Sequence, residues 1–148
     1  MVTRISVGDA IVLDHDATVM SFPVFCGHVS AGEESFEVCV YPERVTTRLD
    51  PEYERHLVAS INRVTAEFRS VLLSQQARLQ SLICSVSPRV PEDMVTFISS
   101  LHLARVLVPP PISSDGVAFQ IASDVWDGHD LEVMLDKEWS FRAMHMDG

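Results

Sequence analysis

The chain has 148 residues, a formal net charge of −10 and a hydrophobic content of 47%. This length supports one hydrophobic core, so we predict a single domain over residues 1–148. The hydrophobic content excludes a wholly disordered chain. The 21 acidic residues against 11 basic residues argue against nucleic acid or an anionic membrane as partner, and they favour a basic partner instead.

Short apolar runs predict strands in the N-terminal part of the chain. These runs cover residues 5–7, 10–13, 18–25 and 36–41. The polar residues Asp14, His15 and Asp16 predict a turn between two of the runs, and 30–34 predicts another. Because proline cannot donate to a strand ladder, Pro23 predicts an edge strand or a bulge.

A long amphipathic helix is predicted to begin at Asp50 and Pro51, where a capping side chain precedes a ring already at helical φ. Apolar residues then recur in steps of three and four. They are Leu57, Ile61, Val64, Phe68, Val71, Leu72, Leu79, Leu82 and Ile83. After Pro88 and Pro91, the spacing of the apolar residues in 94–101 predicts a second, shorter helix.

The C-terminal part of the chain predicts further strands. Residues 103–108 form an apolar run, while 117–121 and 131–135 alternate apolar and polar side chains, as half-buried strands do. Residues 139–145 are expected to close an antiparallel meander. The order of elements predicts an α+β fold, in which N- and C-terminal strands form an antiparallel sheet packed against one long and one short central helix.

The sequence gives no motif for a catalytic site, a metal site or a cofactor, so we expect none and predict that the chain is not an enzyme. Cys26, Cys39 and Cys84 are odd in number and widely spaced, which predicts reduced core thiols. The N-terminus lacks the apolar stretch of a signal peptide, and no apolar window is long enough to span a bilayer. We therefore expect a soluble, cytoplasmic protein without membrane contact.

Acidic residues concentrate at the two ends of the chain. Residues 1–49 hold seven acids and three bases, and 124–148 hold seven acids and two bases. If both ends belong to one sheet, the negative charge gathers on that sheet and its loops. The alternative is that these acids only keep a small protein soluble.

The densest polar cluster lies near the C-terminus and supplies the candidate partner-binding residues. They are Asp124, Trp126, Asp127, His129, Asp130, Glu132, Asp136 and Glu138. Acidic loops beside an aromatic anchor suit a basic cleft on another protein. A solvated hairpin turn is the simpler alternative, and a metal site at His129 is disfavoured because neighbours in a turn seldom converge on one ion. A dyad of Cys26 and His28 is disfavoured because residues two apart in a strand only share a face.

This cluster resembles the C-terminal hairpin of a bacterial family of small acidic domains grouped with the immunity proteins of polymorphic toxin systems. The family pattern is Trp-Asp-x-Glu-His-Gly-Leu-x-Val, which Trp126, Asp127, His129, Leu131 and Val133 match. The chain is one residue shorter before the histidine and so lacks the glutamate of the pattern. Asp130 stands where the family pattern has its glycine. The resemblance implies a protein that protects a bacterium by binding a toxin delivered through a secretion system.

The leading hypothesis is therefore an immunity protein that covers the basic cleft of a cognate toxin. The alternative is a secretion chaperone for an effector protein, which predicts a homodimer with an exposed apolar groove along 101–108. A third hypothesis is a metal-assisted hydrolase that uses His129 and nearby carboxylates.

Overall fold

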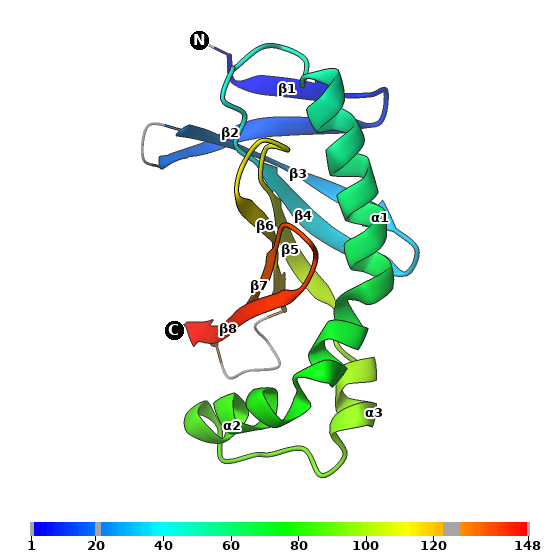
Figure 1. The fold of residues 1–148 in the computed structure, drawn as a ribbon, viewed down its shortest axis with the longest axis vertical. Helices are drawn as coiled ribbons and strands as arrows, with labels where there is room; N and C mark the ends of the chain where they lie inside the picture. Colours follow the sequence, from blue (N-terminus) through cyan, green and yellow to red (C-terminus); the bar gives the residue numbers. More distant parts are fainter. Residues whose placement is uncertain (1, 20–21, 123–127, 148) are drawn as a thin grey trace.

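The computed structural model describes residues 2–19, 22–122 and 128–147, and within them eight strands form one sheet in the order β1 to β8 (Figure 1). The strands are β1 (Arg4–Val7), β2 (Ile11–Val19), β3 (Phe22–Ala31), β4 (Glu34–Val40), β5 (Leu103–Val108), β6 (Asp115–Ile121), β7 (Asp130–Asp136) and β8 (Phe141–Asp147). The helices are α1 (Pro51–Ser74), α2 (Gln76–Val86) and α3 (Met94–Ser99). This architecture confirms the predicted α+β class. No helix in the described ranges is both long and apolar enough to cross a membrane.

The sheet consists of two antiparallel meanders that meet at one parallel pair. All neighbouring strands are antiparallel except β4 and β5, which are parallel and are connected through the three helices. Both ends of the chain therefore belong to one sheet, as expected. However, β1 and β8 are its opposite edges, so the acids of the two end segments are spread across the width of the sheet.

The hydrophobic core lies between the helices and one face of the sheet (Figure 1). The predicted stripe of α1 supplies Leu57, Val64, Phe68 and Leu72, each at most 1% exposed. The ring of Phe68 meets Phe119 of β6 edge to face, with centroids 6.2 Å apart. In the strands, buried residues alternate with residues that point to the opposite face, which we call the helix-free face.

Two local predictions differ from the structure. The predicted turn at Asp14, His15 and Asp16 is wrong, because these residues continue β2, and the ring of His15 packs edge to face on Phe25. Pro23 is not in an edge strand, because β3 lies between β2 and β4. Pro23 itself pairs with Thr18, and the nearby register shift, between His15 and Ala17 of β2, lies opposite Phe25 and Val24.

The long apolar stripe is divided between two helices. Gln75 leaves the helical conformation at φ −117° and ψ 26°, and α2 then turns away from α1 (Figure 1). The 24 residues of α1 already span about 36 Å, which is at least the length of any strand beneath it. A straight continuation would carry Leu79 and Ile83 past the sheet, whereas the bend buries both.

Helix α1 fastens both ends of the parallel β4–β5 pair. At the carboxyl ends, the buried hydroxyl of Tyr53 donates to the Val108 carbonyl at 2.5 Å and accepts from the Tyr41 N–H at 3.2 Å. Burial raises the pKa of Tyr53, so its hydroxyl stays protonated and remains a donor. This one side chain therefore satisfies a backbone group at the end of each strand.

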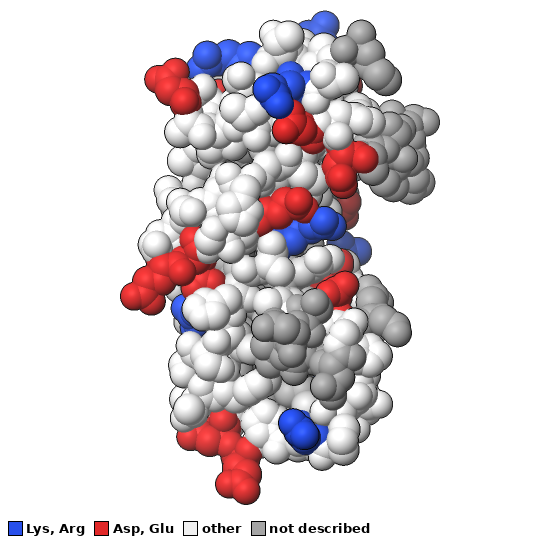
Figure 2. Space-filling view, turned by 180° about the vertical axis from the view of Figure 1, so that it is seen from behind, with Lys and Arg blue, Asp and Glu red and all other residues white. Residues whose placement is uncertain are grey.

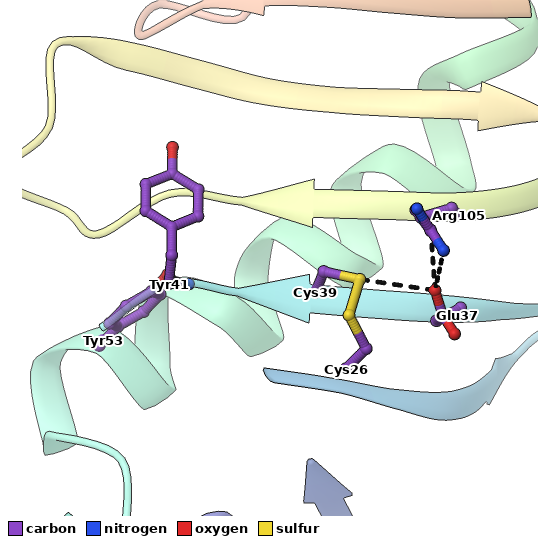
Figure 3. The surroundings of a disulfide bond; sticks show 6 residues. All are labelled: Cys26, Glu37, Cys39, Tyr41, Tyr53 and Arg105. Atoms are coloured by element: carbon purple, nitrogen blue, oxygen red, sulfur yellow. Dashed lines mark hydrogen bonds and ion pairs between the residues drawn. A yellow bond between two sulfur atoms is a disulfide. The ribbon is translucent and has the colours of Figure 1, made fainter. Parts of the chain in front are cut away.

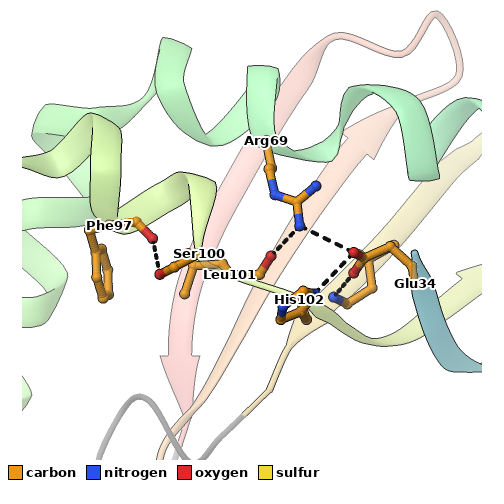
Figure 4. Close-up of polar contacts among 7 residues, drawn as sticks. Glu34, Arg69, Phe97, Ser100, Leu101 and His102 are labelled. Carbon is orange, nitrogen blue, oxygen red and sulfur yellow. Dashed lines mark hydrogen bonds and ion pairs between the residues drawn. The ribbon is translucent and has the colours of Figure 1, made fainter. Parts of the chain in front are cut away.

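At the amino ends of the same pair, the carboxylate of Glu34 is the central acceptor (Figure 4). Its side chain is 2% exposed and accepts from Leu103 N at 2.9 Å, His102 Nδ1 at 3.0 Å and Arg69 Nη2 at 3.1 Å. Arg69 also donates to the Leu101 carbonyl at 2.7 Å. Burial alone would raise the pKa of Glu34, but these hydrogen bonds and the charges of His102 and Arg69 hold it below its ordinary value of 4.5.

We predict that Glu34→Gln lowers the free energy of unfolding by about 2 to 4 kcal/mol at pH 7, because Arg69 loses its buried counter-ion. A carboxyl whose pKa is lowered by folding stabilises the fold above its ordinary pKa, and the contribution disappears as the pH falls through the folded-state value. The difference in free energy of unfolding between wild type and Glu34→Gln should therefore shrink below about pH 4, when urea unfolding is measured at several pH values. The exposed neighbour variant Glu33→Gln is the control, and a gap that does not change with pH would contradict the assignment.

We predict that Tyr53→Phe costs about 1 to 3 kcal/mol, because it leaves two backbone groups unsatisfied while it preserves the ring packing. Urea unfolding followed by circular dichroism measures the change. An unaltered unfolding midpoint would show that water replaces the hydroxyl at the ends of both strands.

Candidate functional site

The structure distributes the predicted binding residues over separate places. Asp124, Trp126 and Asp127 lie outside the described residues. His129 and Asp130 stand at the start of β7, Glu132 lies within the strand, and Asp136 and Glu138 lie at its far end. The six residue steps from Asp130 to Asp136 separate the two ends by roughly 20 Å.

Asp136 has a local structural role in the turn between β7 and β8. Its carboxylate accepts from the backbone N–H groups of Glu138 and Ser140, both at 2.9 Å. Trp139 in this turn has a positive φ of 67°, and the guanidinium of Arg63 stacks 4.5 Å from the centroid of its ring. These contacts anchor the turn to α1, away from the start of β7.

A hollow of about 290 Å³ opens on the helix-free face. Each strand from β2 to β7 contributes at least one residue to its lining, which consists of Asp16, Val24, Cys26, Cys39, Arg105, Leu107, Ala118, Gln120 and Glu132. Glu132 accepts from Gln120 Nε2 at 3.1 Å and is the one residue of the hollow that the sequence predicted. The hollow is therefore the place on this face where residues far apart in the sequence converge.

Carboxylates outnumber cations on the helix-free face. Arg4 is paired with Asp14 at 2.7 Å, and Arg105 is paired with Glu37 at 2.6 Å. In the described part of the chain, no Lys or Arg lies within ion-pair distance of the two further acids of the hollow, Asp16 and Glu132, or of Asp130. The view from behind in Figure 2 shows acidic groups in several separate places, with basic groups beside some of them.

Cys26 and Cys39 form a disulfide (Figure 3), and both residues line this hollow. They are directly opposite partners in the β3–β4 pair, with Cα atoms 4.2 Å apart. The prediction of three reduced core thiols is therefore wrong. The third cysteine, Cys84, is free but exposed rather than in the core.

One group of potential metal ligands occurs among the residues that the structure describes. The ligand atoms of Cys26, Glu37 and Cys39 all lie within 4.8 Å of one another, and Glu37 Oε1 is 3.6 Å from Cys39 Sγ. His129 and Asp130 belong to no such group in these ranges. His28 is engaged elsewhere, because its Nε2 lies 2.6 Å from Ser35 Oγ.

A larger hollow of about 410 Å³ lies at the carboxyl ends of β4 and β5. Its walls include three prolines, and the side chain of Ile112 there is 76% exposed. The polar groups of Asp50 and Tyr53 already serve the fold, since Asp50 accepts from Glu52 N at the start of α1 and Tyr53 joins β4 to β5. Glu43, Arg44 and Glu52 also line this hollow, so it carries charged side chains of both signs.

The apolar groove predicted along 101–108 for a chaperone is absent. Strand β5 lies between β4 and β6 in the middle of the sheet. Leu101, Leu103, Val106 and Val108 are each at most 3% exposed, so these side chains are core and not a docking surface.

Comparison with known proteins adds no family to this description. No family model, curated protein or solved structure matches the chain. The geometry of the helix-free face is therefore the basis of the function proposed below.

We predict that the oxidised, denatured chain has one reactive thiol, from Cys84, and that the reduced chain has three. Thiol titration in denaturant measures both numbers. Reduction should lower the free energy of unfolding by about 2 to 3 kcal/mol, because the disulfide closes a short loop in the unfolded chain. Cys84→Ser serves as the control, and three reactive thiols before reduction would refute the pairing.

Proposed function

We propose that this chain is an immunity protein that binds and neutralises a cognate secreted toxin, and that it acts in the cytoplasm as a binding protein without catalytic activity. The observation that supports this proposal is the acidic hollow on the helix-free face. Asp16 and Glu132 line it, and its single arginine, Arg105, is already paired with the neighbouring Glu37. The hollow therefore retains an excess of negative charge.

The lining suits a lysine or arginine side chain from the partner. Such side chains pack their aliphatic stems on apolar surface while the charged head meets carboxylates. Val24, Leu107 and Ala118 supply the apolar surface, and Asp16 and Glu132 supply carboxylates that no described Lys or Arg approaches within ion-pair distance. The aliphatic stem and the charged head of one basic toxin side chain would thus both find a matching surface in this hollow.

The surrounding face provides the remainder of the contact. It is a continuous sheet, so its side chains are held by paired backbone and need little ordering on binding. Asp130, the first residue of β7, adds a further carboxylate beyond the hollow. The excess negative charge would accelerate encounter with a toxin whose active-site cleft is basic, and the bound sheet would then cover that cleft.

The alternative functions have less support. The secretion chaperone loses the exposed apolar groove that motivated it, because β5 is buried in the centre of the sheet. A hydrolase centred on His129 has no group of three ligands in the described residues to hold its metal. A binding protein needs neither feature.

We predict that this chain rescues growth of a host that expresses the toxin domain encoded beside its gene. We also predict that the double variant Asp16→Asn, Glu132→Gln associates with that toxin about tenfold more slowly at low salt, with a weaker dependence on salt concentration. Stopped-flow association at several salt concentrations measures both effects.

The matched control is Glu67→Gln, Glu92→Gln, which removes the same charge from exposed positions on the helical side. Failure of the wild-type chain to rescue growth or bind would reject the immunity function. Rescue together with equal association rates for the two double variants would instead reject the hollow as the contact surface.

A further inference from the structure

We propose that reduction of the Cys26–Cys39 disulfide creates a site for a soft divalent cation, best represented by Zn²⁺, which both thiolates and the Glu37 carboxylate bind. Both cysteines line the hollow, Glu37 lies beside them, and the three ligand atoms are within 4.8 Å of one another. Thiolate and carboxylate oxygen are both ordinary zinc ligands. This inference does not depend on the proposed immunity function.

The strand register fixes the three ligands on one face. Cys26 and Cys39 are direct partners across β3 and β4, and Glu37 precedes Cys39 by two residues, so all three project to the same side. Ligands of a tetrahedral zinc ion lie roughly 3.5 to 3.8 Å apart, given bond lengths of about 2.0 to 2.3 Å. The existing spread of ligand atoms therefore needs only small side-chain movements.

The fourth coordination position has access to solvent. Cys39 is only 2% exposed, but Cys26 is partly exposed, and the hollow above the pair is open. Asp16 and Glu132 also line this space, and their negative charge raises the local concentration of cations. A water molecule would complete the tetrahedron.

Arg105 neutralises the negative charge that one divalent cation would leave at this site. Two thiolates and one carboxylate carry three negative charges, which one divalent cation and one guanidinium neutralise together. Both Nε and Nη2 of Arg105 contact Oε1 of Glu37, at 2.7 and 2.6 Å. The arginine thus orients the carboxylate toward the sulfur atoms, as outer-shell partners of metal ligands do.

The redox step requires a two-electron reductant, either a dithiol or, in the test below, a phosphine. A dithiol gives two electrons and two protons to the sulfur–sulfur bond, which breaks to yield two thiols, and the dithiol becomes a disulfide. A phosphine gives the two electrons, water supplies the two protons and an oxygen atom, and the product is a phosphine oxide. The divalent cation then displaces the two thiol protons, which leave to solvent. Because the oxidised pair offers no thiolate, the site exists only in the reduced chain.

Cobalt is the spectroscopic probe for this site. The chain is reduced with a phosphine, desalted without oxygen and titrated with Co²⁺, alongside an oxidised sample of the same preparation. We expect thiolate-to-cobalt charge-transfer absorption and intense visible bands of tetrahedral Co²⁺, at one ion per chain, in the reduced sample alone. Addition of Zn²⁺ should abolish these bands, because zinc binds such sites more tightly than cobalt.

Substitution of each proposed ligand tests whether that residue binds the metal. Cys26→Ser and Cys39→Ser should each lose the charge-transfer signal, and Glu37→Gln should weaken Zn²⁺ binding about tenfold or more, by analogy with losses at metal-orienting residues. Cys84→Ser is the matched control and should bind as the wild type does. Circular dichroism of each variant reports whether the sheet remains folded.

Absence of cobalt bands in the reduced wild-type chain would overturn the proposal. So would equal binding by the oxidised chain, or bands that persist in the double variant Cys26→Ser, Cys39→Ser. The wild-type chain is compared with itself in two redox states, so a folding defect in a variant cannot decide the result. No toxin is present, so the outcome is independent of the proposed function.

Discussion

The parallel pairing of β4 with β5 is the constraint on which this fold depends. It is the one parallel pair in the described sheet, and it joins two meanders separated by the helical segment. Tyr53 and Arg69 of α1 fasten its two ends, and the sixteen residue steps from one to the other span about 24 Å of helix. The seven residue steps from Glu34 to Tyr41 span about 23 Å of strand. Helix and strand pair therefore match in length, so one helix can hold both ends.

The same pairing explains where the hollow forms. All helices of the described chain lie on one side of the sheet, so the other face stays open across the junction of the two meanders. Glu37 of β4 and Arg105 of β5 are direct partners there, although 68 residues separate them in the sequence. The disulfide comes from the N-terminal meander, while Gln120 and Glu132 come from the C-terminal meander. Neither half of the chain contains this site alone.

Local sequence patterns predicted the helices and strands but not which strands, and which side chains on them, lie side by side. Asp50 before Pro51, and the alternation in 117–121 and 131–135, identified α1, β6 and β7, because capping and burial of one face depend on nearby residues. The pairing of Glu37 with Arg105 depends on tertiary register, which the sequence does not specify. A local signal for the disulfide was present but unused. A two-residue turn at Gly32 and Glu33 places Cys26 opposite Cys39.

The two proposals concern one hollow, and charge determines how they interact. With the disulfide intact, Asp16, Glu37 and Glu132 against Arg105 leave two net negative charges. Zinc adds two positive charges and its two thiolates add two negative ones, so the net charge of the hollow does not change. Long-range attraction of a basic partner would therefore be the same in both states, since it depends on net charge. The metal and its water would nevertheless occupy the floor that a partner's lysine or arginine needs, so zinc would oppose close docking without weakening the initial encounter.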